Sequence, residues 1–186
     1  MNTTFFKKLK TPSLNVLFIF LAWVSSFVLC VIAKAIFGDA SDNLMNYNPF
    51  VNGFIHGDIS HLGMNLGLMF IFLIPDINQR YDFTKIFFIT LIISIIYFPI
   101  ALSVGIPAVG ISGTLYFMLS RVCLNKKSIP LYIFFGIMII PELTKFTNMT
   151  DGTAHMVHII GALLGLLSLK VEKYNFLPAK VVQYIS

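Results

Sequence analysis

Charged residues are scarce in this chain, and their scarcity excludes most classes of soluble protein. Asp, Glu, Lys and Arg together make up 11% of the 186 residues, whereas hydrophobic residues make up 57% and the mean hydropathy is +0.85. A soluble domain carries about 25% charged residues. The composition therefore predicts a single compact membrane domain, with no room for a second, soluble one.

The chain also has few cysteines and no clustered basic surface. Cys30 and Cys123 both fall in apolar segments. We expect them to be free thiols, and they say little about the redox compartment. The isoelectric point is near 9.3, but the basic residues stand between apolar segments and form no patch with interleaved aromatic residues. This distribution excludes nucleic acid as a partner, and we interpret the basic residues as topology signals.

What the chain does have is long apolar segments. A helix that crosses a bilayer needs about 20 predominantly apolar residues. Six candidate spans can be identified: 13–36, 59–75, 84–104, 112–124, 129–146 and 153–169. The sequence thus predicts an all-α membrane protein whose domain covers residues 13–169, preceded by a cytoplasmic N-terminal segment (1–12) and followed by a cytoplasmic tail (170–186).

The lysines and arginines predict the orientation of these spans. With the N-terminus inside, the outer segments hold only Lys34 and Lys145, and the other 11 basic residues fall on inner segments. Such a bias is typical of the positive-inside rule. We therefore expect a multi-pass plasma membrane protein with both termini in the cytoplasm. Its spans should interact with the lipid bilayer.

The fourth segment is too short to cross the bilayer. From Ser112 to Arg121 it spans 10 residues, about 15 Å of helix against a hydrocarbon core of roughly 30 Å. With Arg121 at the inner surface, Ser112 should begin the helix well below the outer surface. The preceding loop, residues 105–110, would then enter the membrane, where non-helical backbone is tolerated only if it is buried or lines a wet cavity. This length predicts a water-filled site.

Polar side chains should lie at a similar depth on two other spans. His61 and Asn65 fall in the first two turns of segment 59–75, and His158 falls near the start of segment 153–169. Polar groups inside a bilayer are costly and usually functional. A serine hydroxyl needs an adjacent base to become a nucleophile, so these groups are the parts required for acyl transfer. Taken alone, Ser112 has the simpler interpretation of a helix N-cap.

Three motifs together resemble the rhomboid family of intramembrane serine proteases over residues 54–169. They are His56-x4-His61-x3-Asn65, Gly110-Ile111-Ser112-Gly113-x2-Tyr116 and His158-x2-Gly161-x3-Gly165. Each motif alone is weak, but their order and the spans that carry them are specific. The resemblance implies a six-transmembrane-helix rhomboid-like bundle with a short fourth helix that starts within the membrane. It also implies single-pass membrane proteins as substrates.

The resemblance also implies roles for particular residues. Ser112 would be the nucleophile and His158 its general base, a Ser-His dyad without a carboxylate third member. His61, Asn65 and the Ser112 backbone N–H would form the oxyanion hole. Supporting roles fall to the residues that shape or orient these groups: Tyr116 against the imidazole, Gly110 and Gly113 beside the serine, Gly161 and Gly165 at a helix contact, and His56 in the loop.

Two rival interpretations remain. One is a catalytically silent rhomboid-like protein that binds membrane clients, although such proteins usually lack the serine or the histidine. The other is a transporter or metal carrier that uses His56, His61, His155 and His158. His155 falls outside the motifs, and we interpret it as structural. No acidic or thiolate ligand is expected beside these histidines at depth, and the two halves of the chain are not repeated as in many transporters. We therefore predict no metal and no cofactor.

Overall fold

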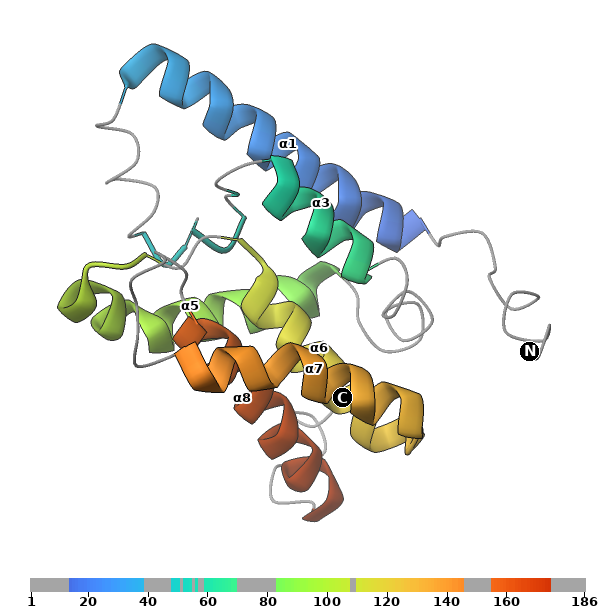
Figure 1. The fold of residues 1–186 in the computed structure, drawn as a ribbon. Helices are drawn as coiled ribbons and strands as arrows, with labels where there is room; N and C mark the ends of the chain where they lie inside the picture. Colours follow the sequence, from blue (N-terminus) through green and yellow to red (C-terminus); the bar gives the residue numbers. More distant parts are fainter. Residues whose placement is uncertain are drawn as a thin grey trace.

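A computed structural model describes residues 14–38, 48–50, 52–54, 56, 59–69, 83–107, 110–145 and 155–174, and every regular element among them is a helix (Figure 1). The elements are α1 (Leu14–Phe37), the 3-10 helix η2 (Asn52–Phe54), α3 (Ile59–Leu68), α5 (Phe83–Val104), α6 (Ser112–Lys126), α7 (Ile129–Lys145) and α8 (His155–Tyr174). The expected all-α fold is confirmed for this part of the chain.

Each predicted span overlaps one of these helices. Helix α8 continues to Tyr174, beyond the predicted end at residue 169, and α6 ends at Lys126, where Lys127 takes a left-handed backbone conformation with φ 46°. Parts of several predictions lie outside the described residues: the segment 1–12, the end of the second span (70–75), position 146, positions 153–154, and the tail beyond 174.

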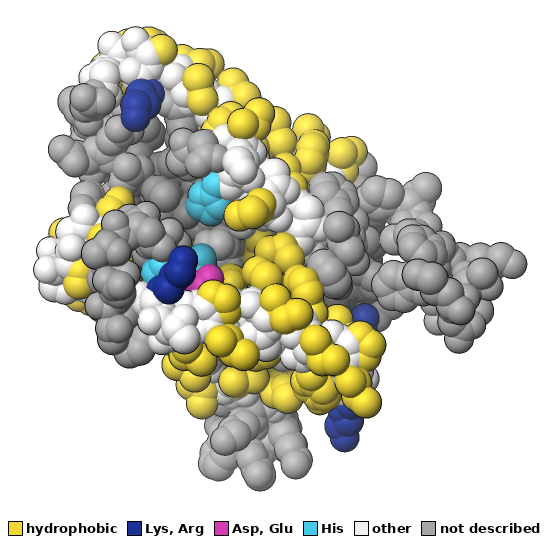
Figure 2. Space-filling model, viewed as in Figure 1, with side chains coloured by type: hydrophobic (Ala, Val, Ile, Leu, Met, Phe, Trp, Pro, Cys, Tyr) yellow, Lys and Arg dark blue, Asp and Glu magenta, His cyan; other side chains and the backbone are white. Residues whose placement is uncertain are grey.

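The described helices present an apolar exterior. Two stretches, Phe20–Phe37 in α1 and Thr84–Val104 in α5, are long and apolar enough to cross a membrane, and α8 has a shorter apolar stretch, His155–Leu169. Hydrophobic side chains cover much of the described surface in Figure 2, whereas histidine and acidic side chains are seen near its middle. An apolar exterior around a polar interior is what a lipid environment favours.

Helix α6 is the centre of the fold. Every residue from Ser112 to Cys123 is buried, because α6 contacts α3, α5, α7 and α8, and its contact with α8 is the most extensive between described elements. Helix α7, by contrast, has no fully buried residue and lies at the periphery. The buried position of α6 means that any polar group on it must find its partner inside the protein.

Arg121 illustrates this requirement and corrects an expectation. The sequence suggested a basic anchor at the inner membrane surface, but Arg121 is only 1% exposed. Its guanidinium donates a hydrogen bond to the Ser168 hydroxyl of α8 and lies 5.8 Å from the centre of the Phe117 ring. The side chain cannot reach water because α8 covers this face of α6.

Candidate active site

Ser112 is the first residue of α6, but it does not cap the helix. The N-cap position is Ile111, and no side chain caps this end, so the simpler interpretation of Ser112 as an N-cap is wrong. The first backbone N–H groups of a helix lack partners within the helix, and the helix dipole makes this end positive. Ser112 therefore lies where negative charge is stabilised.

The loop before Ser112 is held in place from two sides. The Gly110 N–H donates a hydrogen bond of 2.9 Å to the Asn52 carbonyl in η2, and the Tyr97 hydroxyl of α5 donates one of 3.0 Å to the Ile106 carbonyl. Gly110 has a φ of +89°, and a Cβ there would lie 3.0 Å from Cε1 of His61. A glycine is needed at this position for both reasons, and its small size lets the His61 ring approach the loop.

Helices α6 and α8 approach so closely that only glycine fits between them. A Cβ at Gly161 would collide with the Gly113 carbonyl oxygen, and a Cβ at Gly165 would collide with the Ser120 hydroxyl and the Phe117 carbonyl. Small residues allow two helix backbones to approach in this way. The approach determines how far a side chain on α8 must reach to contact one on α6.

Replacing Gly161 by alanine should therefore impair the site strongly. The added methyl group must separate α8 from α6, and a misplacement of roughly 1 Å can lower a reaction rate about 100-fold. We expect the Gly161→Ala variant to lose about that much of the serine-dependent activity of the purified protein. Gly136→Ala is the matched control, because a Cβ at Gly136 in α7 meets nothing within 4 Å. Equal activity of the two variants would contradict this account of the helix contact.

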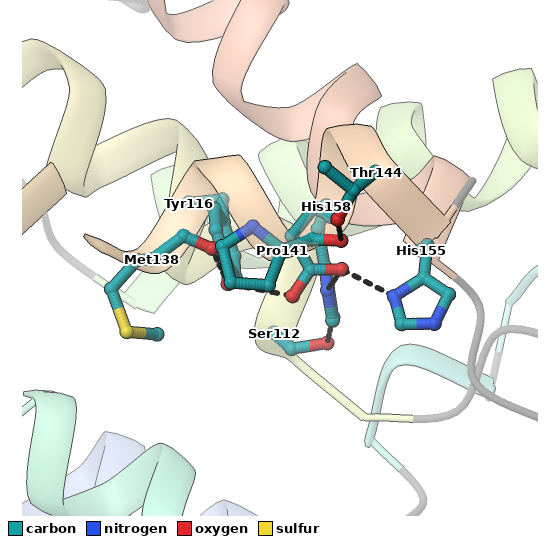
Figure 3. Close-up of polar contacts among 8 residues, drawn as sticks. Ser112, Tyr116, Met138, Pro141, Thr144, His155 and His158 are labelled. Atoms are coloured by element: carbon teal, nitrogen blue, oxygen red, sulfur yellow. Dashed lines mark hydrogen bonds and ion pairs between the residues drawn. The ribbon is translucent and has the colours of Figure 1, made fainter. Parts of the chain in front are cut away.

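This close approach brings a serine and a histidine together. The Ser112 Oγ and His158 Nε2 atoms are 2.8 Å apart, which is hydrogen-bond distance. The Tyr116 ring, one turn along α6, stacks on the imidazole with ring centres 4.6 Å apart and planes inclined by 11°. Figure 3 shows Ser112, Tyr116, His155 and His158 around one point where α6, α7 and α8 meet. The Ser112 hydroxyl is therefore in direct hydrogen-bond contact with a group that can act as its base.

An acidic residue that the sequence did not single out lies at the same point. Glu142 of α7 accepts a hydrogen bond from the Tyr116 hydroxyl at 3.0 Å through Oε1. Its Oε2 lies 2.6 Å from His155 Nδ1 and 2.9 Å from His158 Nδ1. The second approach has hydrogen-bond length but poor direction, as is common in unliganded active sites. A carboxylate inside an apolar segment is a functional signal, but Lys145, three residues further on, gave Glu142 the appearance of a solvated helix end.

Glu142 also corrects the expectation that no acidic group accompanies the histidines. One ligand atom each from Glu142, His155 and His158 lie within 4.8 Å of one another, and a carboxylate with two imidazoles is a ligand set that zinc accepts. Ligand atoms around tetrahedral zinc are roughly 3.3 Å apart, given bonds of about 2.0–2.1 Å. The Glu142 carboxylate oxygen is closer than that to the Nδ1 atoms of both histidines. The three side chains would therefore have to move apart to hold an ion, and in this structure they contact one another directly.

The remaining predicted residues lie on or beside α3, which contacts α6. Asn65 is buried, and its Nδ2 makes no hydrogen bond. The His61 ring lies against the Gly110 loop and packs edge-on against the buried His56 ring, with centres 5.3 Å apart. A buried amide donor without a partner is rare in folded proteins and calls for a functional explanation.

A comparison with protein families identifies the family of this chain. The Rhomboid domain model matches residues 43–172, which is more than half of the chain. The chain therefore belongs to the rhomboid family and is a membrane protein, as the three motifs predicted. No curated protein and no solved structure matches it.

Proposed function

We propose that this chain is an intramembrane serine endopeptidase that uses Ser112 as nucleophile and His158 as general base. The observation that carries the proposal is the separation of 2.8 Å between Ser112 Oγ and His158 Nε2. A nucleophile and a base within hydrogen-bond reach are the signature of covalent catalysis by serine. A silent family member would have no need of this contact.

The reaction follows from the positions of these groups. His158 Nε2 accepts the Ser112 proton as Oγ attacks the scissile carbonyl carbon, and a tetrahedral intermediate with a negatively charged oxygen forms. The imidazolium then donates its proton to the leaving amine. Water, deprotonated by the same imidazole, hydrolyses the acyl-enzyme and releases Ser112. Stacking of the Tyr116 ring on His158 restricts the rotation of the imidazole through both steps.

The developing oxyanion would be stabilised from the α3 side. Asn65 Nδ2 is a buried donor with no partner, His61 lies against the loop that precedes Ser112, and the Ser112 N–H belongs to the first turn of α6, which no side chain caps. Donors held ready before the charge develops stabilise the transition state most effectively. We assign the oxyanion hole to these three groups.

In the membrane, we place the protein as a six-span bundle in the plasma membrane with both termini in the cytoplasm. The site would lie beneath the outer face, because α6 spans 15 residues, roughly 22 Å of helix, and the exposed Lys126 in its last turn belongs to the inner side. Substrates would be single-pass membrane proteins whose spans unwind near the outer face. Small residues are expected at the cleavage site, because His61 and Val157 already pack against Gly110 and Gly113 on either side of Ser112.

Co-expression with a tagged single-pass model substrate tests the proposal. We expect a truncated substrate fragment with the wild-type chain and none with Ser112→Ala. Equal amounts of the fragment with both chains would contradict the proposed function. Co-purification of uncut substrate with the wild-type chain, with no fragment at any time, would instead indicate a silent protein that binds membrane clients.

A further inference from the structure

The role of Glu142 goes beyond a serine-histidine pair. We propose that Glu142 is a positioning residue for the catalytic histidine: a carboxylate third member, supplied by α7, that fixes the tautomer and orientation of the His158 imidazole. This inference rests on the proposed proteolytic function and adds a group that the motifs do not contain.

Both ring nitrogens of His158 have a functional neighbour. Nε2 lies 2.8 Å from Ser112 Oγ, and Nδ1 lies 2.9 Å from Glu142 Oε2. In a neutral imidazole one nitrogen carries the proton and the other carries a lone pair. A carboxylate beside Nδ1 favours the proton on that nitrogen, which leaves the Nε2 lone pair directed at the Ser112 hydroxyl. Only this tautomer can take the serine proton.

The negative charge of Glu142 also stabilises the protonated imidazole. When Ser112 transfers its proton to Nε2, the imidazole becomes positively charged, and a negative oxygen 2.9 Å from Nδ1 stabilises that charge. The carboxylate takes no proton itself, as in serine protease triads. Glu142 is only 12% exposed, and the attraction between charges grows as water is excluded. Glu142 therefore stabilises mainly the state in which the imidazole is charged, and this stabilisation should raise the rate of the chemical step.

Two neighbouring side chains hold the Glu142 carboxylate in place. Its Oε1 accepts the Tyr116 hydroxyl at 3.0 Å, and its Oε2 contacts His155 Nδ1 at 2.6 Å. These contacts fix the carboxylate from α6 and α8, although α7 itself is peripheral. His155 therefore helps to orient the carboxylate that lies beside His158. This contact gives a specific form to the structural role that the sequence predicted for His155.

Kinetics of the purified full-length protein in liposomes can test the proposal. We expect Glu142→Gln to lower kcat roughly 10- to 100-fold, the range found when a group that orients a metal-bound histidine is lost, with KM unchanged. Modification of Ser112 by a fluorophosphonate should slow to a similar degree. Glu142→Asp, which keeps the charge on a shorter side chain, should recover part of the loss. Thr144→Val, an exposed change on the same helix, should match the wild type.

Several outcomes would overturn the proposal. Glutamine has the same shape as glutamate and can still form hydrogen bonds between α7 and α8. A Glu142→Gln variant with wild-type kcat and wild-type labelling would therefore show that Glu142 has only a structural role. Loss of wild-type activity on treatment with a chelator would make the cluster a metal site instead. If the wild-type protein neither cleaved substrate nor reacted with the fluorophosphonate, the proposed function as a whole would be contradicted. If the wild-type protein and the Glu142→Gln variant were equally active, only this inference would be contradicted.

The wild-type protein supplies an independent measurement if the glutamine variant does not fold. The ¹⁵N resonances of the His158 ring, assigned by their absence in His158→Ala, report which nitrogen carries the proton at neutral pH. We expect a protonated Nδ1 and an unprotonated Nε2. A proton on Nε2 in the resting protein would overturn the proposal.

Discussion

Replacing Ser112 or His158 by alanine should abolish proteolysis, with a loss of kcat on the order of 10⁶-fold for either change. Losses of that size follow removal of the nucleophile or the base from a serine protease. The two residues act as one unit, because the Ser112 Oγ–His158 Nε2 hydrogen bond of 2.8 Å is useful only when both partners are present. The double variant should therefore be no worse than either single variant. Cleavage of a fluorogenic transmembrane peptide by the purified protein in liposomes measures all three.

The control for this pair is a serine outside the site. Ser103 is exposed near the end of α5 and donates a hydrogen bond only to its own helix, at the Ile100 carbonyl. Ser103→Ala should cleave at the wild-type rate and unfold at the wild-type temperature. Residual cleavage above about one per cent of wild type in both Ser112→Ala and His158→Ala would require a different nucleophile.

The second large effect is expected at the proposed oxyanion hole. Asn65→Ala and His61→Ala should each lower kcat about 10²- to 10³-fold, equivalent to about 2.7–4 kcal/mol of barrier, and leave KM nearly unchanged. The reason is that these donors act on the charged intermediate and much less on the neutral substrate. Because Asn65 Nδ2 makes no hydrogen bond in the folded chain, removing this donor breaks no hydrogen bond of the fold.

Met64→Ala is the matched control for these two variants. Met64 lies next to Asn65 on α3, but its side chain is 66% exposed and faces away from the packed interior. It should retain wild-type kcat. If both Asn65→Ala and His61→Ala also retained wild-type kcat, the oxyanion hole would have to be built from other donors.

Most of the helical framework was predictable because the apolar segments are separated by short polar or glycine-containing connections. The motif around Ser112 predicted the start of α6, and the Gly161 and Gly165 spacing predicted a close helix contact. Both expectations use local periodicity, which the sequence records directly. The resemblance to the rhomboid family, based on three motifs in order, is confirmed by the family match over residues 43–172. The catalytic roles of the individual residues stay predictions.

The parts that were missed depend on how distant helices pack. Glu142 lies three residues before Lys145 near the end of a predicted span, where such a pair normally forms on a solvated helix end. Its functional environment arises only because α7 packs against α6 and α8. Arg121 looked like a surface anchor for the same reason, since nothing in its own segment shows that α8 covers it. Periodicity within one helix cannot reveal which neighbour lies over a charge.

The most direct test of the central claim is mass-spectrometric mapping of a fluorophosphonate adduct on the purified protein. The account predicts one modified serine, Ser112, in the wild type, and no modification of Ser112 over the same time in His158→Ala. An unmodified wild-type Ser112, or equal labelling of Ser112 with and without the His158 imidazole, would show that the contact of 2.8 Å does not make a nucleophile.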